Sequence, residues 1–258
     1  MNRYARLNAL LDVMAAKGHV DVDQVARELQ VSTSTIRRDL NHLNRQQLVT
    51  RTRGGAVATT VNYDLPIRYR TAKHASEKSR IGAAAAALVE PGDIVGLNGG
   101  TTTTEVARAI AERSTDPASA QITIVTNAIN IAGELTVRRN VKLVMSGGVA
   151  RLQSFELTGL LAADTLRQVD LDIAILGVDA FDPRTGAKTA DEEEANINRI
   201  MAERAQKLII VADSSKLSAR AFARICPVAD VHYFITDTNA PAEAVATIRA
   251  AGITVITV

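Results

Sequence analysis

The chain has 258 residues, of which 47% are hydrophobic and 22% are charged, the composition of an ordinary globular protein with a core. Its length allows one large domain or two smaller ones. Cys226 is the single cysteine, which excludes an intrachain disulfide and a cysteine-rich zinc site, and the scattered histidines predict no metal site. No signal peptide and no apolar run near the roughly 18 residues of a membrane span is recognisable, so we expect a cytoplasmic protein.

The charge is unevenly distributed along the chain. Residues 1–60 carry nine Lys and Arg against five Asp and Glu, a net charge of +4, whereas the remainder carries −2. A basic N-terminal region followed by a mildly acidic remainder predicts that only the N-terminal region binds a polyanion. This excess of positive charge is modest, and chance alone also produces an excess of this size. The sequence motifs must therefore decide whether the N-terminal region binds a polyanion.

The first 45 residues predict three helices. The first ends at Gly18 and has apolar side chains spaced i, i+3, i+4 and i+7 along one face: Leu7, Leu10, Leu11 and Met14. The second begins at the N-cap residue Asp21, with Gln24 in the capping-box position. A tight turn at residues 30–31 leads to a third helix, capped by Ser32, whose inward positions are Ile36, Leu40 and Leu43.

Helix, short turn and helix form the unit that places its second member in a DNA major groove. Arg37 and Arg38 suit that role because arginine makes paired hydrogen bonds to guanine. The amides and dipole of the helix start favour phosphate. The candidate DNA-binding residues of this helix are Ser32, Thr33, Ser34, Thr35, Arg37, Arg38, Asn41 and Arg45.

Residues 48–57 alternate and turn at Gly54–Gly55, which predicts a β-hairpin wing. Arg51 and Arg53 lie two residues apart, on one face of a strand, and are further candidates for phosphate or minor-groove contacts. Each of these features, taken alone, is also explained by a small helical subdomain with solvent-exposed arginines. The turn, caps, arginines and wing together favour a DNA-binding winged helix-turn-helix.

The run Val31-Ser-Thr-Ser-Thr-Ile-Arg-Arg-Asp-Leu40, followed by Arg53-Gly-Gly-Ala56, resembles the signature of the DeoR family of bacterial transcriptional regulators. Arg53 stands where that family often has His, and arginine serves a phosphate contact equally well. The predicted organisation is a DNA-binding domain at 1–58, a linker at 59–76 and a second domain at 77–258. The basic residues around the linker are expected to form a solvated surface, with additional phosphate contacts as the alternative: Arg68, Arg70, Lys73, His74, Lys78 and Arg80.

The second domain alternates strand-like and helical patterns, which predicts an α/β fold with a mainly parallel sheet covered on both faces. The strand-like runs are Ile94–Leu97, Ile122–Val125, Val141–Met145, Ile173–Leu176, Leu208–Ala212, Tyr233–Ile235 and Thr254–Val258. The helical stretches are Ile81–Leu88, Thr103–Ala111, Ala128–Leu135, Thr158–Arg167, Asp191–Arg204 and Ala240–Ala251.

Small and polar residues follow these runs, and in such a sheet the loops at the carboxyl ends of the strands form a ligand crevice. The loop 98–104 has two glycines and four threonines at a helix start, which predicts an anion cradle, or alternatively an ordinary turn with a threonine cap. The pattern is neither Walker A nor a dinucleotide motif, so no nucleotide cofactor is expected. Lys216 could neutralise a phosphate, or be a solvated lysine in a turn.

Three carboxylates could accept hydrogen bonds from a polyol: Asp179, Asp191 and Glu194. Asp191 could equally be a helix cap, and Glu194 a solvated helix residue. The body also resembles the DeoR sensor domain, which is similar in fold to ribose-5-phosphate isomerase. The resemblance implies a phosphorylated-sugar effector, a homodimer or homotetramer, and most often a repressor. The candidate effector residues are Asn98, Gly99, Gly100, Thr101, Thr102, Thr103, Thr126, Asn127, Ser146, Gly147, Gly148, Asp179, Asp191, Glu194 and Lys216.

In this chain Asn98 replaces the carboxylate with which the family's Asp-x-Gly-Thr-Thr pattern begins, which alters the hydroxyl contacts and lessens repulsion of an anion. The favoured function is a regulator of carbohydrate genes whose operator affinity changes with a bound sugar phosphate. It has no catalytic residues. The alternative is an isomerase-like or hydrolytic enzyme with a DNA-binding head, in which Lys216 and a carboxylate do acid–base work. A nucleoid protein would need a larger basic excess.

Overall fold

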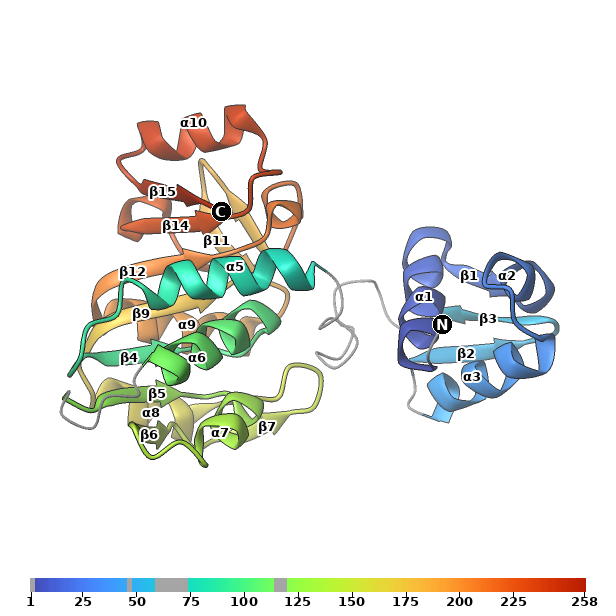
Figure 1. Ribbon diagram of the computed structural model, residues 1–258, viewed down its shortest axis with the longest axis horizontal. Helices are drawn as coiled ribbons and strands as arrows, with labels where there is room; N and C mark the ends of the chain where they lie inside the picture. Colours follow the sequence, from blue (N-terminus) through green and yellow to red (C-terminus); the bar gives the residue numbers. More distant parts are fainter. Residues whose placement is uncertain (1–2, 46–47, 59–73, 114–119) are drawn as a thin grey trace. The chain divides into compact units, whose positions relative to one another are not determined.

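The computed structural model describes residues 3–45, 48–58, 74–113 and 120–258 and divides the chain into two compact units, 1–73 and 74–258 (Figure 1). Arg68, Arg70 and Lys73 of the predicted linker lie outside the described residues. No helix of the described part is long and apolar enough to cross a membrane.

The first unit is a winged helix-turn-helix, as predicted. Three helices, α1 (Arg3–Lys17), α2 (Val22–Glu28) and α3 (Thr33–Arg45), pack on an antiparallel sheet of order β1-β3-β2. The strands are β1 (His19–Asp21), β2 (Val49–Thr52) and β3 (Gly55–Ala58). All the predicted inward residues of α1 and α3 are buried in one core. The strand β1, three residues long, was not predicted.

The ends of α2 and α3 show which capping contacts form. Asp21 accepts hydrogen bonds from the backbone N–H groups of Asp23 and Gln24, at 3.0 and 2.8 Å, and Ser32 Oγ accepts from Thr35 N at 3.2 Å, so both predicted caps are confirmed. The reciprocal half of the capping box is absent here, because the Gln24 side chain donates to Glu28 instead.

The wing turns one residue earlier than predicted. Arg53 and Gly54 form the turn, Gly54 with φ 89°, and Gly55 already belongs to β3. A Cβ at Gly55 would lie 1.9 Å from Val20 O, so this glycine is needed where β3 approaches β1. The expectation that Arg51 and Arg53 share a strand face was therefore wrong, since Arg53 lies in the turn.

The second unit contains a seven-stranded parallel sheet of order β15-β14-β12-β9-β4-β5-β6. All seven predicted runs are its strands: β4 (Ile94–Leu97), β5 (Ile122–Thr126), β6 (Val141–Met145), β9 (Leu171–Gly177), β12 (Ala205–Val211), β14 (Tyr233–Thr236) and β15 (Thr254–Thr257). Their side chains alternate between two buried clusters. In β9, Ile173 and Ile175 join one cluster, and Ala174 and Leu176 join the other.

Helices cover both faces of this sheet. One cluster contains side chains of α5 (Ala75–Ala86), α6 (Thr101–Arg113) and α7 (Ile129–Leu135). The other contains side chains of α8 (Leu160–Arg167), α9 (Glu192–Glu203) and α10 (Ala242–Ala250). The predicted doubly covered sheet is thus confirmed. Because α5 begins at Ala75, the last two residues of the predicted linker belong to a helix, and Lys78 is buried rather than solvated.

Two small sheets that the sequence did not predict lie beside the main one. The strands β7 (Val149–Arg151) and β8 (Glu156–Thr158) form a hairpin, and β10 (Ala180–Asp182), β11 (Gly186–Thr189) and β13 (Ala223–Cys226) form an antiparallel sheet. Each strand has only three or four residues, too few for a clear periodicity.

The order of the main sheet reverses at one point. The chain builds β5 and β6 on one side of β4, then returns to build β9, β12, β14 and β15 on the other side. Ligands of open α/β sheets bind at the carboxyl ends of the strands where the order reverses. In this sheet that point lies between the ends of β4 and β9, where the loops starting at Asn98 and after Gly177 meet.

Candidate functional site

One face of α3 is exposed and polar. Ser34, Arg37, Arg38, Asn41 and Arg45 are all exposed, and their spacing of three and four residues places them on the same side of the helix. The opposite side is buried by the core residues Ile36, Leu40 and Leu43. The helix therefore presents one row of hydrogen-bonding side chains, which suits the donors and acceptors that bases expose in a DNA major groove.

A buried ion pair fixes this helix to α1. Asp39 is 1% exposed and accepts a hydrogen bond from Arg6 Nε at 2.5 Å, and Arg3 Nε lies 3.8 Å from its other oxygen. Asp39 is not among the functional residues predicted from the sequence. Its position between Ile36 and Leu40 on the inward side of α3 was the available signal, because an aspartate is seldom buried without a partner.

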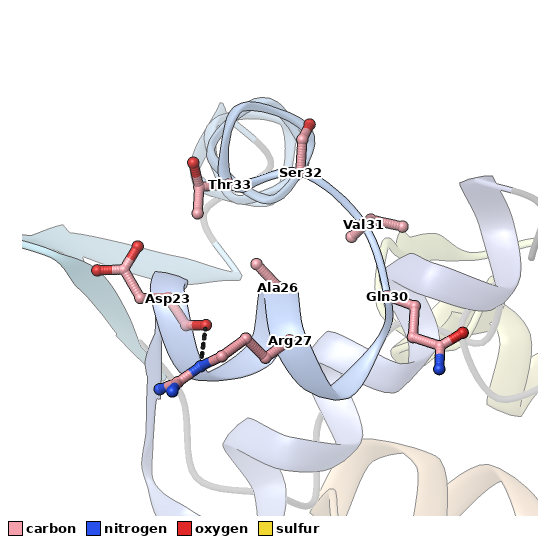
Figure 2. Close-up of a pocket in the computed structure, with 7 residues that line it drawn as sticks. All are labelled: Asp23, Ala26, Arg27, Gln30, Val31, Ser32 and Thr33. Carbon is pink, nitrogen blue, oxygen red and sulfur yellow. Dashed lines mark hydrogen bonds between the residues drawn. The ribbon is translucent and has the colours of Figure 1, made fainter.

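A shallow hollow lies between α2 and the start of α3 (Figure 2). Arg27 lines it and donates from Nε to the Asp23 carbonyl oxygen at 3.2 Å. The Ser32 hydroxyl lies within 2.8 Å of Ser34 Oγ and 2.9 Å of Thr35 Oγ1. These hydroxyls thus organise the first turn of α3, and the free amides and the dipole of a helix start favour a phosphate.

The two wing arginines differ in their surroundings. Arg51 is half-buried and donates from Nη1 to the Gly55 carbonyl oxygen at 2.9 Å, which closes the hairpin. Arg53 is exposed in the turn. Of the two, Arg53 has the more accessible guanidinium for a phosphate.

The side chain of Asn98 joins the two loops at the switch point. It is 1% exposed, donates from Nδ2 to the Gly177 carbonyl and accepts from the Gly177 N–H, both at 2.9 Å. The Asn98 side chain thus continues the hydrogen bonding between β4 and β9 beyond the last backbone pair of the two strands. Asn98 holds the crevice loops together, and its hydrogen bonds in this structure are made to the backbone.

The loop after Asn98 is tightly wound. Gly100 has φ 149°, and its carbonyl oxygen accepts from Thr104 Oγ1 at 2.6 Å and Thr103 Oγ1 at 3.2 Å. A Cβ at Gly99 would lie 2.4 Å from Cγ of Glu156, a residue that is itself 3% exposed. A carboxylate that the sequence analysis missed therefore lies against the predicted anion cradle.

Glu156 also contacts the loop after β5. Asn127 Nδ2 donates to Glu156 Oε2 at 2.9 Å, while the buried Asn127 Oδ1 has no hydrogen-bond partner among the described residues. Thr126 Oγ1 donates to the Leu97 carbonyl at 2.7 Å. The loop after β6 lies against β8 of the β7–β8 hairpin, since a Cβ at Gly148 would lie 2.6 Å from the Thr158 carbonyl oxygen.

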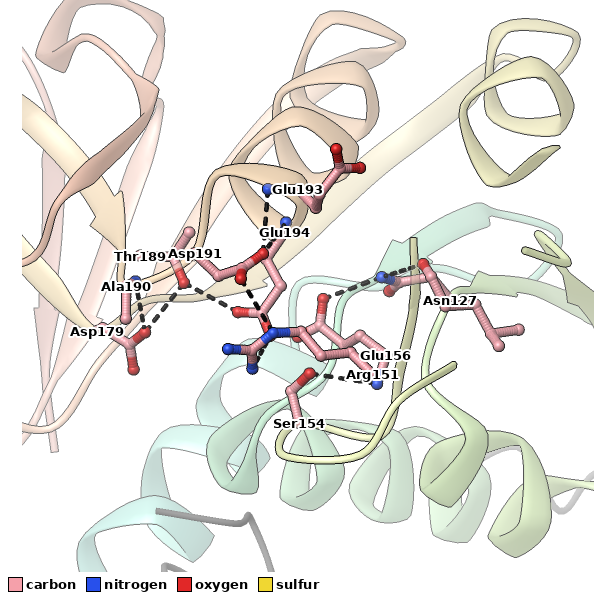
Figure 3. A network of polar contacts seen from close by, with 11 residues as sticks. Asn127, Arg151, Ser154, Glu156, Asp179, Thr189, Ala190, Asp191, Glu193 and Glu194 are labelled. Atoms are coloured by element: carbon pink, nitrogen blue, oxygen red, sulfur yellow. Dashed lines mark hydrogen bonds and ion pairs between the residues drawn. The ribbon is translucent and has the colours of Figure 1, made fainter. Parts of the chain in front are cut away.

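The three predicted carboxylates belong to one polar network (Figure 3). Asp191 caps α9 by accepting from the N–H groups of Glu193 and Glu194. Arg151 of β7 donates to Asp191 and to Glu194, each at 3.0 Å. The remaining link is the Thr189 hydroxyl, which lies 2.9 Å from Asp179 Oδ2 and 3.1 Å from Glu194 Oε2. Asp191 is thus the predicted helix cap, whereas Glu194 is not solvated.

Glu194 has an unusual environment for a carboxylate. Burial raises the pKa of its carboxyl group, with help from the nearby Asp179 and Asp191, and this outweighs the lowering effect of the Ser154 hydrogen bond and of Arg151. Arg151 and Ser154 come from the hairpin that the sequence analysis did not predict, so no sequence signal placed them here.

Lys216 lies in a 3-10 turn, η1 (Ser214–Leu217), directly after β12. The turn starts at Asp213, which is 2% exposed and accepts hydrogen bonds from Ser215, while Lys78 Nζ of α5 lies 3.6 Å from Asp213 Oδ2. Burial alone would raise the pKa of Asp213, but the Ser215 hydrogen bond and the charges of Lys78 and Lys216 hold it below the usual value. Lys78 therefore pairs with this buried carboxylate, and Lys216 lies three residues after it in the chain.

The structure thus brings together most of the predicted effector residues at one edge of the sheet. The loops after β4, β5 and β9 are joined by Asn98, Asn127 and Glu156, and the carboxylate network continues from the loop after β9. Lys216 enters from the loop after β12, the neighbour of β9 in the sheet. The fold and these two sites define a DNA-binding regulator with a winged helix-turn-helix and an α/β domain.

The comparison with protein families agrees with this class. Residues 6–61 match the DeoR-like helix-turn-helix domain, and residues 73–238 match the DeoR C-terminal sensor domain. The chain belongs to the DeoR family of transcriptional regulators. The resemblance seen in the sequence is confirmed, and the regulator is favoured over the enzyme.

Several curated relatives match nearly the whole chain. A putative aga operon transcriptional repressor of Escherichia coli O157:H7 is 34% identical over 98% of this chain and 93% of its own length. The glycerol-3-phosphate regulon repressor of Escherichia coli K12 is 29% identical over 93% of each chain. Among solved structures, ribose 5-phosphate isomerase A from Methanocaldococcus jannaschii is 18% identical, with a TM-score of 0.42, over 56% of this chain and 55% of that one. The predicted likeness to the isomerase fold stays a prediction.

Proposed function

We propose that this regulator represses carbohydrate-metabolism genes and that a phosphorylated sugar, bound at the carboxyl edge of the parallel sheet, changes its affinity for the operator. The observation that carries the proposal is the division of this edge into two poles. Carboxylates and an amide gather on one side (Asp179, Glu194, Glu156, Asn127). On the other, Lys78 pairs with Asp213, and Lys216 lies in the turn that follows Asp213. Hydroxyl groups match the first pole and a phosphate matches the second.

One relative supports the ligand class. The glycerol-3-phosphate regulon repressor is named for a phosphorylated polyol. In the present chain the effector contacts are assigned to the loops 98–103, 126–127 and 146–148, with Asp179, Asp191, Glu194 and Lys216. Asn98 and Asp191 act there by positioning, since their side chains bond Gly177, the start of α9 and Arg151.

For the operator, we assign base contacts to the exposed face of α3, through Arg37, Arg38 and Asn41. Ser32 to Thr35 and Arg45 lie at the two ends of that helix and suit backbone phosphates. Arg53 suits a phosphate or the minor groove, and Arg51 supports the wing from within.

A thermal-shift screen tests the effector proposal. The purified full chain is heated with paired sugars and polyols, each with and without its phosphate. A ligand at 100 times its dissociation constant stabilises the native state by about 2.7 kcal/mol. We expect stabilisation by a phosphorylated compound and not by its unphosphorylated partner. Equal responses to both members of every pair would refute the proposed ligand class.

Lys216→Ala is expected to leave operator affinity unchanged and to weaken the response to the effector about tenfold or more, because a charged hydrogen bond to the phosphate is lost. Operator binding is measured by fluorescence anisotropy while the stabilising ligand is titrated. The matched control is Lys142→Ala, an exposed lysine of the edge strand β6. A wild-type titration curve for Lys216→Ala would remove this lysine from the site.

We infer that the second unit also forms the homo-oligomer, because helix-turn-helix regulators read repeated half-sites as dimers. Four large apolar side chains of β7, its turn and the start of α8 are exposed: Val149 by 69%, Leu152 by 75%, Leu160 by 80% and Leu161 by 69%. Such patches mark interfaces, and a two-fold axis pairs a patch with itself. Leu160→Ser with Leu161→Ser should lower the molar mass in light scattering, whereas exposed Val137→Ser should not. An unchanged mass places the interface elsewhere.

A further inference from the structure

The two edge strands of the main sheet differ in how they are protected. Among the described strands, only β5 pairs with β6 and only β14 pairs with β15. A free edge presents unpaired N–H and C=O groups to other chains, and proteins commonly block it with charges or prolines. The edge strand β6 carries the exposed Lys142. The segment 252–258, which contains β15, has no charged residue and no proline, so its edge is open to pairing.

The hydrogen bonds of β15 show which of its backbone groups face away from the sheet. The N–H groups of Thr254 and Val258 donate to carbonyl oxygens of the β14 segment, residues 232–236, at 3.0 and 2.9 Å. In a parallel pair, both backbone groups of every second residue face the same neighbour. The N–H and C=O groups of Val255 and Thr257 therefore point outward, where they can pair with a further strand.

The helix α10 lies beside β15 (Figure 1), and side chains of both elements line a groove of about 280 Å³. Three of the lining residues of α10 are small or short: Ala242, Val245 and Ala246. The fourth, Arg249, donates from Nη2 to the outward carbonyl of Val255 at 3.5 Å, which is long for a hydrogen bond. The small side chains leave room for another chain, and the long contact of Arg249 is easily exchanged for a strand.

The charges of α10 favour a second copy of the chain that runs in the opposite direction. Glu243 lies in the first turn of this helix and Arg249 in its last turn, and the exposed Ala246 lies midway between them. A two-fold axis beside Ala246 brings Glu243 of each helix toward Arg249 of the other and sets the two helix dipoles antiparallel. The same axis makes the two β15 strands antiparallel, so their outward backbone groups can pair with each other.

We propose that β15 pairs with β15 of a second copy across a two-fold axis, which joins the two main sheets into one and packs α10 against α10. This interface is separate from the exposed apolar patch of β7 and α8, because β7 follows β6, at the opposite edge of the sheet. A chain with two different self-complementary interfaces forms a closed tetramer when their two-fold axes are perpendicular. The proposal needs no effector and adds a second interface to the one inferred above.

The test places charges beside the proposed axis in the full chain. Ala246→Lys and Ala246→Glu each bring like charges together across a two-fold axis, whereas an equimolar mixture of the two variants brings opposite charges together. The matched control is Thr247→Lys, an exposed site about 100° further round the same helix and outside the groove. Sedimentation velocity and light scattering give the molar mass at equal protein concentrations, and circular dichroism shows whether each variant is folded.

We expect each Ala246 variant to have about half the molar mass of the wild type, and the equimolar mixture and Thr247→Lys to keep the wild-type mass. Thr257→Pro removes an outward N–H but no bond to β14, so it should lower the mass in the same way, whereas Thr257→Ser should not. A wild-type mass in both Ala246 variants would overturn the proposal, and the edge would then be open to an extended segment of another protein.

The variants of the apolar patch separate the two interfaces. If Leu160→Ser with Leu161→Ser and Ala246→Lys each lower the mass, and their combination gives a monomer, both interfaces stand. If only Ala246→Lys lowers the mass, the β15 interface stands and the apolar patch is not an interface. A wild type that is already monomeric would overturn both.

Discussion

Replacing Asp39 by Ala is expected to destabilise the DNA-binding unit by about 3–5 kcal/mol, the cost of breaking a buried ion pair from one side. Asp39 is 1% exposed, and its loss leaves the Arg6 guanidinium, whose side chain is 12% exposed, without its closest acceptor. Because this pair fixes α3 against α1, the variant should also lose operator binding. Hydrogen exchange measured on peptides from residues 6–58 of the full chain reports the stability of this unit separately.

The matched control is Asp12→Ala, an exposed aspartate on α1. Its effect should stay within about 0.5 kcal/mol, the usual range for a surface substitution. Should Asp39→Ala exchange as slowly as Asp12→Ala, the pair with Arg6 would have no role in holding the recognition helix.

Arg37→Ala and Arg38→Ala are each expected to weaken binding to the specific operator by about 1–3 kcal/mol if that arginine makes a paired contact to a base. Both side chains are exposed on the polar face of α3, so neither substitution should disturb the core. The measurement is the ratio of specific to nonspecific affinity, which should fall for a residue that contacts a base. An arginine whose removal leaves this ratio at the wild-type value does not take part in base recognition.

Arg53→Ala provides the contrast within the same unit. Arg53 lies in the wing turn, where its expected partner is a phosphate. Its loss should weaken binding to every sequence about equally and reduce the dependence of log K on log salt by about one ion. A sequence-dependent loss would instead assign Arg53 to base recognition.

The local patterns of this sequence were enough for the helices and for the seven strands of the main sheet. The helix spacing from Leu7 to Met14, the caps at Asp21 and Ser32, and the seven apolar runs all concern neighbours along the chain, and each is confirmed. The DeoR-like motif at residues 31–40 indicated the family for the same reason. Local geometry and burial of one face depend on residues only a few positions apart, so they can be recognised without the fold.

The candidate sites depended more on contacts between distant segments. Arg151, Glu156 and Lys78 looked like ordinary charged residues in the sequence, and Asp39 like one more acid in a helix. Each acquires its role from a partner far away: Glu194 is 43 residues from Arg151, and Asp213 is 135 residues from Lys78. The three-residue strands that carry Arg151 and Glu156 have no periodicity of their own.

The sequence by itself therefore determined the family and the two kinds of domain, and it predicted candidate residues for DNA and effector contacts. Only the tertiary structure decided which charges meet. It buried Asn98 against Gly177, turned the threonines at 103 and 104 toward the Gly100 carbonyl, and paired Lys78 with Asp213. The physical reason is that burying a charge is favourable only beside a suitable partner, and that partner is supplied by the packing of distant segments.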